Sequence, residues 1–309
     1  MEAESLTAIL ISTFDRYEPI ARWTASRIHT EWQDHPPIFF SGLNRTASDS
    51  LGFEGDPRDW MGVTLNAVHC LINRGFTHAY LILDDHPPVG KCNSDFLNVR
   101  LPDLSRKINA AHISLLGYGQ HRRREGVVDI VDGIRVERLP GSYRWKFSLH
   151  PGLWKIQDLQ FLLEQRMLDY LGKDRTPWNF ERHRDSSHEL VMKECGARCH
   201  RLHGTSNADG RSLLLLISEA GLRFKADVSM FFAKRAGGTS ERNLVEERTL
   251  WCFGHYSGAY PIFWSGCLRQ GKVHADFEKW LGHFGSESIR ESWKSFVAEN
   301  SEMLIINKT

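Results

Sequence analysis

The sequence lacks the features that would place the chain in a membrane, a secretory pathway or a disulfide-bonded scaffold. The longest apolar run, residues 213–217, falls far short of the roughly 18 residues that a membrane span needs. The first four residues, Met-Glu-Ala-Glu, are acidic and precede no signal-peptide pattern. The six cysteines are scattered, which favours buried, reduced thiols. These absences favour a soluble, cytoplasmic protein.

The chain also lacks an excess of charge of either sign, because 39 Lys and Arg are balanced by 38 Asp and Glu. Such a chain has no global field to hold a nucleic-acid backbone, so we expect no nucleic-acid partner. One basic run, residues 120–125, is typical of a solvated loop. The contents of 41% hydrophobic and 25% charged residues are those of a globular protein. The 309 residues allow one large domain or two small ones.

The first 41 residues carry the pattern of a βαβ unit. An apolar run at 6–12 predicts a buried strand, and a polar turn follows at 13–16. Spaced apolar residues at 20–32 predict a helix, and a second apolar run at 37–41 predicts the next strand. We therefore expect an α/β fold.

Further elements follow from the same periodicities. The expected elements are a helix at 60–73, strands at 78–83 and 113–116, an exposed hairpin at 127–139, a helix at 158–171 and terminal helices at 277–284 and 289–304. Gly237-Gly238 reads as a flexible joint.

Asp84 and Asp85 come directly after the expected strand 78–83, and two prolines follow at 87 and 88. Ligands of an open α/β sheet bind beyond the carboxyl ends of its strands. Adjacent carboxylates are costly to hold together unless a positive group neutralises them, and a divalent cation that bridges them to phosphate oxygens would do so. The alternative is an acidic turn, because Asp before Pro is a common turn signal.

The segment from Ala8 to Arg22 resembles the opening of A-type glycosyltransferases, which begin with an apolar strand, a polar turn and a helix. The resemblance implies a mixed, nucleotide-binding sheet flanked by helices. It also implies that the turn cradles the donor nucleotide, and the turn residues here are Thr13, Phe14, Asp15 and Arg16. We expect this turn beside the same sheet edge as Asp84 and Asp85.

In that family an Asp-x-Asp strand end holds a metal and the diphosphate of a nucleotide sugar. This chain has Asp84-Asp85-His86 instead, which leaves open which acid contacts metal and which contacts the donor. The resemblance implies Mn or Mg as the cofactor, although metal-independent variants of such folds exist.

Residues 146–155 and 176–182 are similar to motifs of bacterial glycosyltransferases of surface-polysaccharide biosynthesis. The similarity implies that Glu181 is the general base and that Trp178 is the sugar platform, with Trp154 also on the acceptor side. His150 stands where the pattern has Gln, and is a candidate third metal ligand or a hydrogen-bonded loop residue.

Residues 260–272 resemble a late segment of the same proteins, in which Arg269 and Lys272 would reach the leaving diphosphate. An ordinary basic loop is the alternative. The resemblance spans residues 6–272 and implies a nucleotide-sugar-binding half at 1–125, and an acceptor-binding and C-terminal helical half at 126–309. It implies a nucleotide-sugar donor and a glycan or polysaccharide acceptor, through which the enzyme lies at the periphery of a membrane.

Three alternatives remain. Cys195, Cys199, His200 and His203 could hold zinc, although at helical spacing three of them would share one helix face. A nucleotidyltransferase would use similar acids but needs a Gly-rich loop near its N-terminus, and the first glycine of this chain is Gly42. The third alternative is a non-catalytic nucleotide- or sugar-binding protein of the same fold.

Overall fold

A computed structural model of the chain describes residues 6–43, 48–53, 55–56, 58–118, 127–139, 147–181, 198–203, 255–256, 258–269 and 271–305. The basic run at 120–125, the apolar run at 213–217, Cys195 and the glycine pair at 237–238 lie outside these residues.

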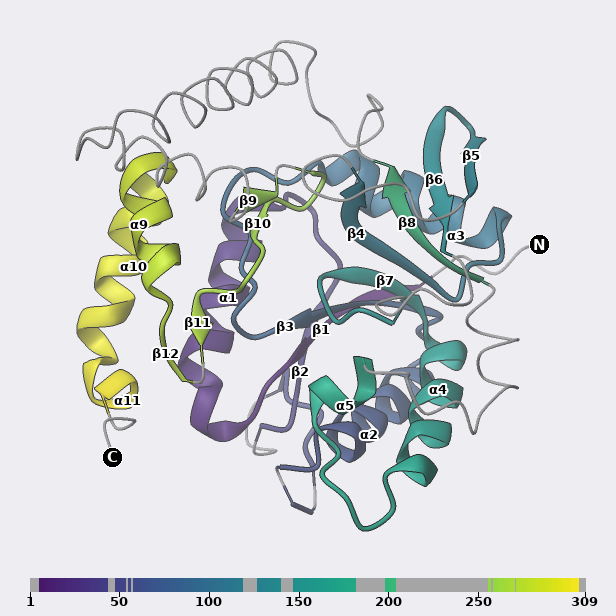
Figure 1. The fold of residues 1–309 in the computed structure, drawn as a ribbon, viewed down its shortest axis with the longest axis horizontal. Helices are drawn as coiled ribbons and strands as arrows, with labels where there is room; N and C mark the ends of the chain where they lie inside the picture. The colour runs from purple at the N-terminus through teal and green to yellow at the C-terminus, as the bar shows by residue number, and fades with distance from the viewer. Residues whose placement is uncertain are drawn as a thin grey trace, which may run out of the picture.

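A mixed, eight-stranded sheet forms the centre of the described structure (Figure 1). Its order is β2-β1-β3-β7-β4-β8-β6-β5. The bounds are β1 Thr7–Ser12, β2 Ile38–Ser41, β3 His78–Leu83, β4 His112–Tyr118, β5 Val127–Val131, β6 Ile134–Arg138, β7 Gly152–Lys155 and β8 Cys199–His203. β1 pairs in parallel with both β2 and β3, whereas β7 runs antiparallel between β3 and β4. Strands from both expected halves of the chain therefore share one sheet.

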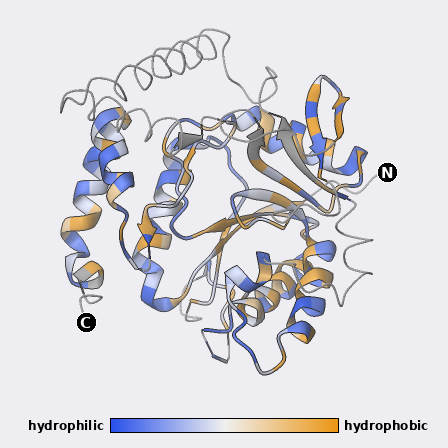
Figure 2. Cartoon of the chain, in the orientation of Figure 1, coloured by the Kyte–Doolittle hydropathy of each residue, from blue (hydrophilic) through white to orange (hydrophobic). Residues whose placement is uncertain are grey.

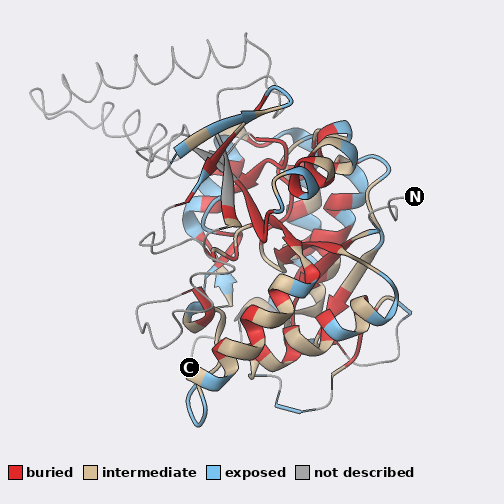
Figure 3. Cartoon of the chain, turned by 90° about the vertical axis from the view of Figure 1, so that its right-hand side faces the viewer, coloured by how far each residue is buried: buried red, intermediate tan, exposed pale blue. Residues whose placement is uncertain are grey.

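Helices cover both faces of this sheet. On one face the core joins alternate residues of β1 and β3 to α1 (Glu18–Glu31), the π-helical turn η2 (Phe96–Arg100) and α3 (Leu101–Lys107). On the other face it joins the remaining strand residues to three helices. These are α2 (Trp60–Asn73), α4 (Ile156–Asp169) and α5 (Pro177–Glu181). Because β1 and β3 are buried from both sides, their residues 8–11 and 79–83 are apolar without alternation (Figure 3).

The C-terminal helices pack against the outer side of α1. They are α9 (Ala275–Phe284), α10 (Glu287–Glu299) and α11 (Ser301–Ile305). Trp23 of α1 stacks near Trp293 and Phe296 of α10, and its indole nitrogen donates to Ser292 at 2.8 Å. Apolar and polar residues alternate around α9 and α10, as expected for helices with one buried face (Figure 2). Two short hairpins, β9 (His255–Tyr256) with β10 (Ile262–Phe263) and β11 (Leu268–Arg269) with β12 (Lys272–Val273), precede these helices.

The expected α/β architecture is confirmed, and most expected elements occur where the periodicity predicted them. The hairpin at 127–139 forms as β5 and β6, and its turn at Asp132-Gly133 has φ angles of 48° and 77°, which an Asp-Gly pair adopts readily. The expectation of a shared helix face for Cys199 and His203 was wrong. Residues 199–203 form β8, which pairs in parallel with β4 and antiparallel with β6. Within the described residues, no helix combines the length and apolar character needed to cross a membrane.

Candidate functional site at the carboxyl end of the sheet

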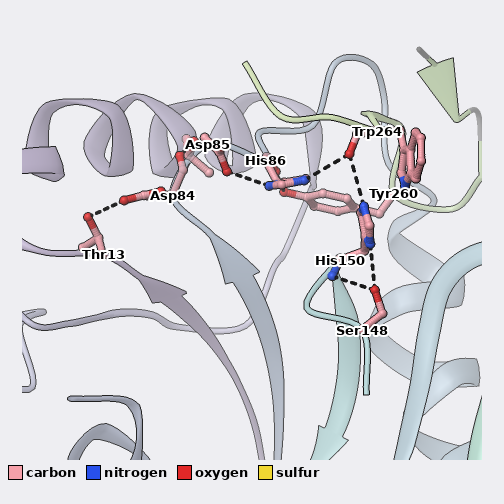
Figure 4. A network of polar contacts seen from close by, with 9 residues as sticks. Thr13, Asp84, Asp85, His86, Ser148, His150, Tyr260 and Trp264 are labelled. Carbon is pink, nitrogen blue, oxygen red and sulfur yellow. Dashed lines mark hydrogen bonds and ion pairs between the residues drawn. The ribbon is translucent and has the colours of Figure 1, made fainter. Parts of the chain in front are cut away.

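The first element of the site is the junction between the ends of β1 and β3. The parallel register places Ser12 opposite Leu83, so the next residues, Thr13 and Asp84, emerge side by side. The Thr13 hydroxyl donates to Asp84 Oδ2 at 2.9 Å, and the Asp84 backbone N–H donates to the Ser12 carbonyl at 3.2 Å. From α1, the Thr24 hydroxyl donates to the Asp84 carbonyl at 2.5 Å. The strand ends therefore hold the Asp84 side chain in one orientation (Figure 4).

Residues of α2 and β2 hold the end of β1 by further hydrogen bonds to Ser12 and Thr13. Trp60 of α2 donates its indole N–H to the Ser12 hydroxyl at 2.7 Å, and the Thr13 backbone N–H contacts the Ser41 hydroxyl at 3.4 Å. Gly42 follows β2 with φ +72°, and a Cβ there would lie 2.4 Å from the Thr13 carbonyl oxygen. Only glycine allows this close approach, which explains why the first glycine of the chain stands at the end of β2.

The rest of the expected nucleotide turn lies at the same edge of the sheet. Asp15 begins a short 3₁₀ turn, η1 (Asp15–Tyr17), that leads directly into α1. Asp15 and Arg16 are exposed, whereas Phe14 is half-buried and packs against the core on the α2 side. Thr13, Asp15 and Arg16 therefore occupy the loop that adjoins Asp84, as the sequence predicted.

The charge of Asp84 is unfavourable in its surroundings. Burial, followed by the neighbouring charge of Asp85, raises the pKa of Asp84 from 3.8 to about 8, against the opposing effect of the Thr13 hydrogen bond. The junction therefore carries a carboxyl group that is readily protonated when nothing positive faces it.

Asp85 differs from Asp84 because it has a cationic partner. His86 Nδ1 lies 2.7 Å from Asp85 Oδ1, and His86 Nε2 lies 3.3 Å from the carbonyl oxygen of Trp264. Both of these oxygens accept, so His86 makes both bonds only with a proton on each ring nitrogen. Burial by itself would lower the pKa of His86, but the charge of Asp85 and these hydrogen bonds outweigh it, and the pKa is raised. Asp85 and His86 thus form an ion pair.

The segment 258–269, in which the loop 264–267 joins β10 to β11, lies against this ion pair. The Cys267 backbone N–H donates to the Asp85 carbonyl at 2.8 Å, and the Tyr260 hydroxyl donates to the His86 carbonyl at 3.1 Å. Gly266 has φ +76°, and a Cβ there would lie 2.4 Å from Asp85 Oδ2. Glycine is therefore required for the loop to approach the acidic pair this closely.

The carbonyl of Trp264 also joins the acidic pair to the segment before β7. His150 Nε2 lies 3.2 Å from that carbonyl, while His150 Nδ1 lies 2.7 Å from the Ser148 hydroxyl. Since the carbonyl can only accept, His150 Nε2 carries the proton, and in the neutral ring Nδ1 accepts from Ser148. A continuous line of polar contacts thus runs from Asp85 through His86, Trp264 and His150 to Ser148 (Figure 4).

Glu181 lies at the far end of this line. Its Oε1 accepts from the Leu149 backbone N–H at 2.7 Å and lies 3.4 Å from the Ser148 hydroxyl. The Glu181 side chain is buried, with only 7% of the residue exposed. Glu181 is therefore connected to the site by its contacts with the loop that carries Ser148 and His150.

The two tryptophans expected on the acceptor side have contrasting positions. Trp154 is 1% exposed in β7 and stacks on His112 with ring centroids 4.0 Å apart. Its ring belongs to the core on the α4 face, so the expectation that it meets an acceptor was wrong. Trp178, in α5, is 67% exposed, and its place in an acceptor site stays a prediction.

Arg269 and Lys272 lie directly opposite each other in the β11–β12 hairpin, and both side chains are exposed. The hairpin begins immediately after Cys267, which contacts Asp85. Their proposed contact with a leaving diphosphate stays a prediction.

The residues expected to bind metal do not converge on one point. Among the described residues, no group of three or more His, Cys, Asp and Glu side chains is arranged to hold a metal ion. His150 is engaged by Ser148 and Trp264, and Asp85 by His86. A cation would stabilise the ionised form of Asp84, which burial and the charge of Asp85 destabilise. Magnesium commonly uses one or two carboxylates and takes its other ligands from substrate phosphates and water, and this donor set fits that mode.

Sequence reasoning missed His86, Ser148 and Trp264 as members of the site. His86 follows the acidic pair, and its position beside two carboxylates was the available signal for an ion pair. Trp264 lies 178 residues from His86 along the chain, and only folding brings them together.

Comparisons of the chain with protein-family models, with curated proteins and with solved structures found no match.

Proposed function

We propose that the protein is a nucleotide-sugar glycosyltransferase with an A-type α/β fold. The observation that carries the proposal is the contact between Thr13 and Asp84, 2.9 Å apart, which joins the expected nucleotide turn to the expected diphosphate-binding acid. A mixed sheet covered by helices on both faces, with these residues at the carboxyl ends of parallel strands, supports the same reading.

In this proposal the donor lies along the edge formed by β1 and β3. The nucleoside contacts the turn of Asp15 and Arg16, and the diphosphate lies at Asp84. Asp84 and Asp85 would hold Mn or Mg together with the diphosphate oxygens. The cation, when bound, neutralises charge on the departing diphosphate. Arg269 and Lys272 supply further positive charge at the same end of the sheet.

The acceptor hydroxyl must lose a proton as the new glycosidic bond forms. Glu181 is the proposed final proton acceptor. The Ser148 hydroxyl lies 3.4 Å from Glu181 Oε1. In the proposed relay its O–H turns from His150 Nδ1 to Oε1, so that Ser148 Oγ takes the proton of the acceptor hydroxyl and releases its own proton to Glu181. The glycan or polysaccharide acceptor, the cytoplasmic location and the peripheral contact with a membrane through the acceptor belong to the proposal as well.

The test is release of a nucleoside diphosphate from a panel of UDP-, GDP- and dTDP-sugars with manganese present, followed by mass spectrometry of a glycan mixture after incubation. A glycosyltransferase releases the diphosphate and adds one sugar mass to an acceptor. Binding of the donor without any release or transfer would contradict the enzymatic proposal.

A second candidate is a non-catalytic protein that binds a nucleotide or sugar. The Asp85–His86 ion pair favours it, because one of the two acids already has a cationic partner. The same panel separates the two candidates, since the non-catalytic protein binds the donor and leaves it intact.

A further inference from the structure

Trp264 is 39% exposed, whereas the other large apolar residues of the segment, from Tyr260 to Leu268, are buried. Phe263 is 3% exposed and packs against Phe277 and Trp280 of α9, with ring centroids 5.4 and 6.0 Å away. Cys267 on the other side is fully buried. The loop is thus anchored at both ends and turns one large aromatic side chain outward. An indole that is held in place and exposed presents a flat apolar face on which a ligand can pack.

The backbone of Trp264 is fixed relative to the acidic pair. A single imidazole ring, that of His86, separates the Asp85 carboxylate from the Trp264 carbonyl. The indole ring is nearly parallel to His150, with centroids 5.8 Å apart and planes 15° from parallel. The indole therefore has a defined orientation as well as a defined position.

Trp264 also stands between the two chemical groups of the proposed reaction. On one side His86 leads to Asp85 and the donor diphosphate. On the other side His150 leads to Ser148 and from there to Glu181. A molecule that lies against the indole can present a hydroxyl to Ser148 while it faces the donor, and this is the requirement for an acceptor.

We propose that Trp264 is the platform for a pyranose ring of the acceptor, with the apolar face of the sugar packed on the indole. This inference rests on the proposed glycosyltransferase function. An aromatic face suits the C–H side of a sugar ring, and such a contact changes affinity by about 3- to 10-fold. His86 and His150 are positioning residues in this arrangement, because they hold the Trp264 carbonyl.

The experiment has two arms on the full chain. The first measures binding of UDP and GDP, with manganese, to the wild type and to Trp264→Ala by calorimetry. The second measures saturation-transfer NMR from the same proteins to methyl glucopyranoside, methyl galactopyranoside and methyl mannopyranoside, with the bound nucleotide present. Trp264→Phe keeps an aromatic face, and Leu171→Ala removes another exposed apolar side chain, which is 65% exposed in the wild type.

The expected result is unchanged nucleotide affinity in Trp264→Ala together with a 3- to 10-fold weaker signal for at least one methyl glycoside. Trp264→Phe should recover most of that signal, and Leu171→Ala should retain it. Equal saturation-transfer signals in wild type and Trp264→Ala would overturn the inference, and so would the absence of a signal in the wild type. In both cases nucleotide binding by the wild type would still support the proposed donor site. Weaker nucleotide binding in Trp264→Ala would also overturn it, by making the indole a nucleobase platform. Failure of both nucleotides to bind the wild type would instead count against the proposed function.

Discussion

The imidazole rings of His86 and His150 are perpendicular, with centroids 5.6 Å apart, and each directs Nε2 at the same carbonyl oxygen, that of Trp264. His86 follows the strand β3 and His150 precedes β7, so the shared acceptor connects two antiparallel neighbours to the loop 264–267. Backbone carbonyls have two lone pairs and can accept two such bonds. This shared contact makes one site from three segments that are far apart in the sequence.

Gly266→Ala tests how closely that loop must approach the acidic pair. The φ of +76° disfavours alanine, and the new Cβ would lie 2.4 Å from Asp85 Oδ2, so the loop or the Asp85 side chain must shift. Gly172→Ala is the matched control, because Gly172 has φ +71° with nothing within 4 Å of the position of a Cβ. We expect urea denaturation to show a loss of about 1–3 kcal/mol for Gly266→Ala, larger than that for Gly172→Ala. Equal losses would mean that only the backbone angle matters and that the loop does not press on Asp85.

Asp84→Asn tests the electrostatic cost of the acidic pair. The ordinary pKa of an aspartate side chain is 3.8, and the pKa of Asp84 in the folded chain is about 8. As pH rises from 4 to 8 the unfolded chain releases this proton before the folded one, so the wild type loses stability across that window and no further above it. Asparagine does not titrate, and it can still accept the Thr13 hydrogen bond.

The stability of Asp84→Asn relative to wild type should therefore increase from pH 5 to pH 8, measured by urea denaturation with a chelator present. Asp85, His86 and Thr13 face the same group and are kept in both proteins, so the two proteins differ only at position 84. A difference that stays constant over this range would show that Asp84 has an ordinary pKa in the folded chain.

Asp15→Ala tests the proposed nucleotide turn. Asp15 is exposed in the turn that follows Thr13, so its loss should leave stability unchanged and weaken nucleotide binding by about 1–3 kcal/mol, with or without manganese. Calorimetry with UDP and GDP provides the measurement. The control is Glu299→Ala, which removes an exposed carboxylate from the end of α10. Identical affinities for Asp15→Ala and wild type would place the nucleotide elsewhere.

Glu181→Gln tests the proposed proton acceptor. Glutamine keeps the oxygen that accepts from the Leu149 backbone at 2.7 Å, so the loop should hold its position, but it does not take up a proton. Steady-state transfer should fall by about 10²–10⁴-fold with donor affinity unchanged. Ser148→Ala should lower the same rate if the proton passes through that hydroxyl. Full turnover in Glu181→Gln would remove Glu181 from the chemistry, and lost donor binding would move it to the donor site.

The sequence predicted those parts of the fold that depend on local patterns. Apolar runs identified β1 and β3 because both strands are buried on two faces, and the spacing of apolar residues identified α2 within its observed bounds. The polar turn after β1 and the acids after β3 were expected at one edge because parallel strands end together, and the Thr13–Asp84 contact lies there.

The remaining parts depend on packing between distant segments. Gly152–Lys155 is a four-residue strand inserted between β3 and β4, and a segment so short carries no distinctive period. Cys199 and His203 are spaced like residues on one helix face, yet they form β8 because this segment pairs with β4 on one side and β6 on the other. The sequence also did not show that Trp154 lies in the core, because an indole is equally suited to a core and to a sugar site.

We propose that the carboxylates at the end of β3 bind the diphosphate of a nucleotide through a divalent cation. Calorimetric titration of UDP and GDP into the wild type and into the double variant Asp84→Asn, Asp85→Asn, with manganese and with a chelator, tests it most directly. We expect one nucleotide to bind the wild type more tightly with manganese, and the folded double variant to lose this manganese-dependent gain in affinity. Equal, manganese-dependent binding by both proteins would contradict the account and would leave the acidic pair as a structural turn.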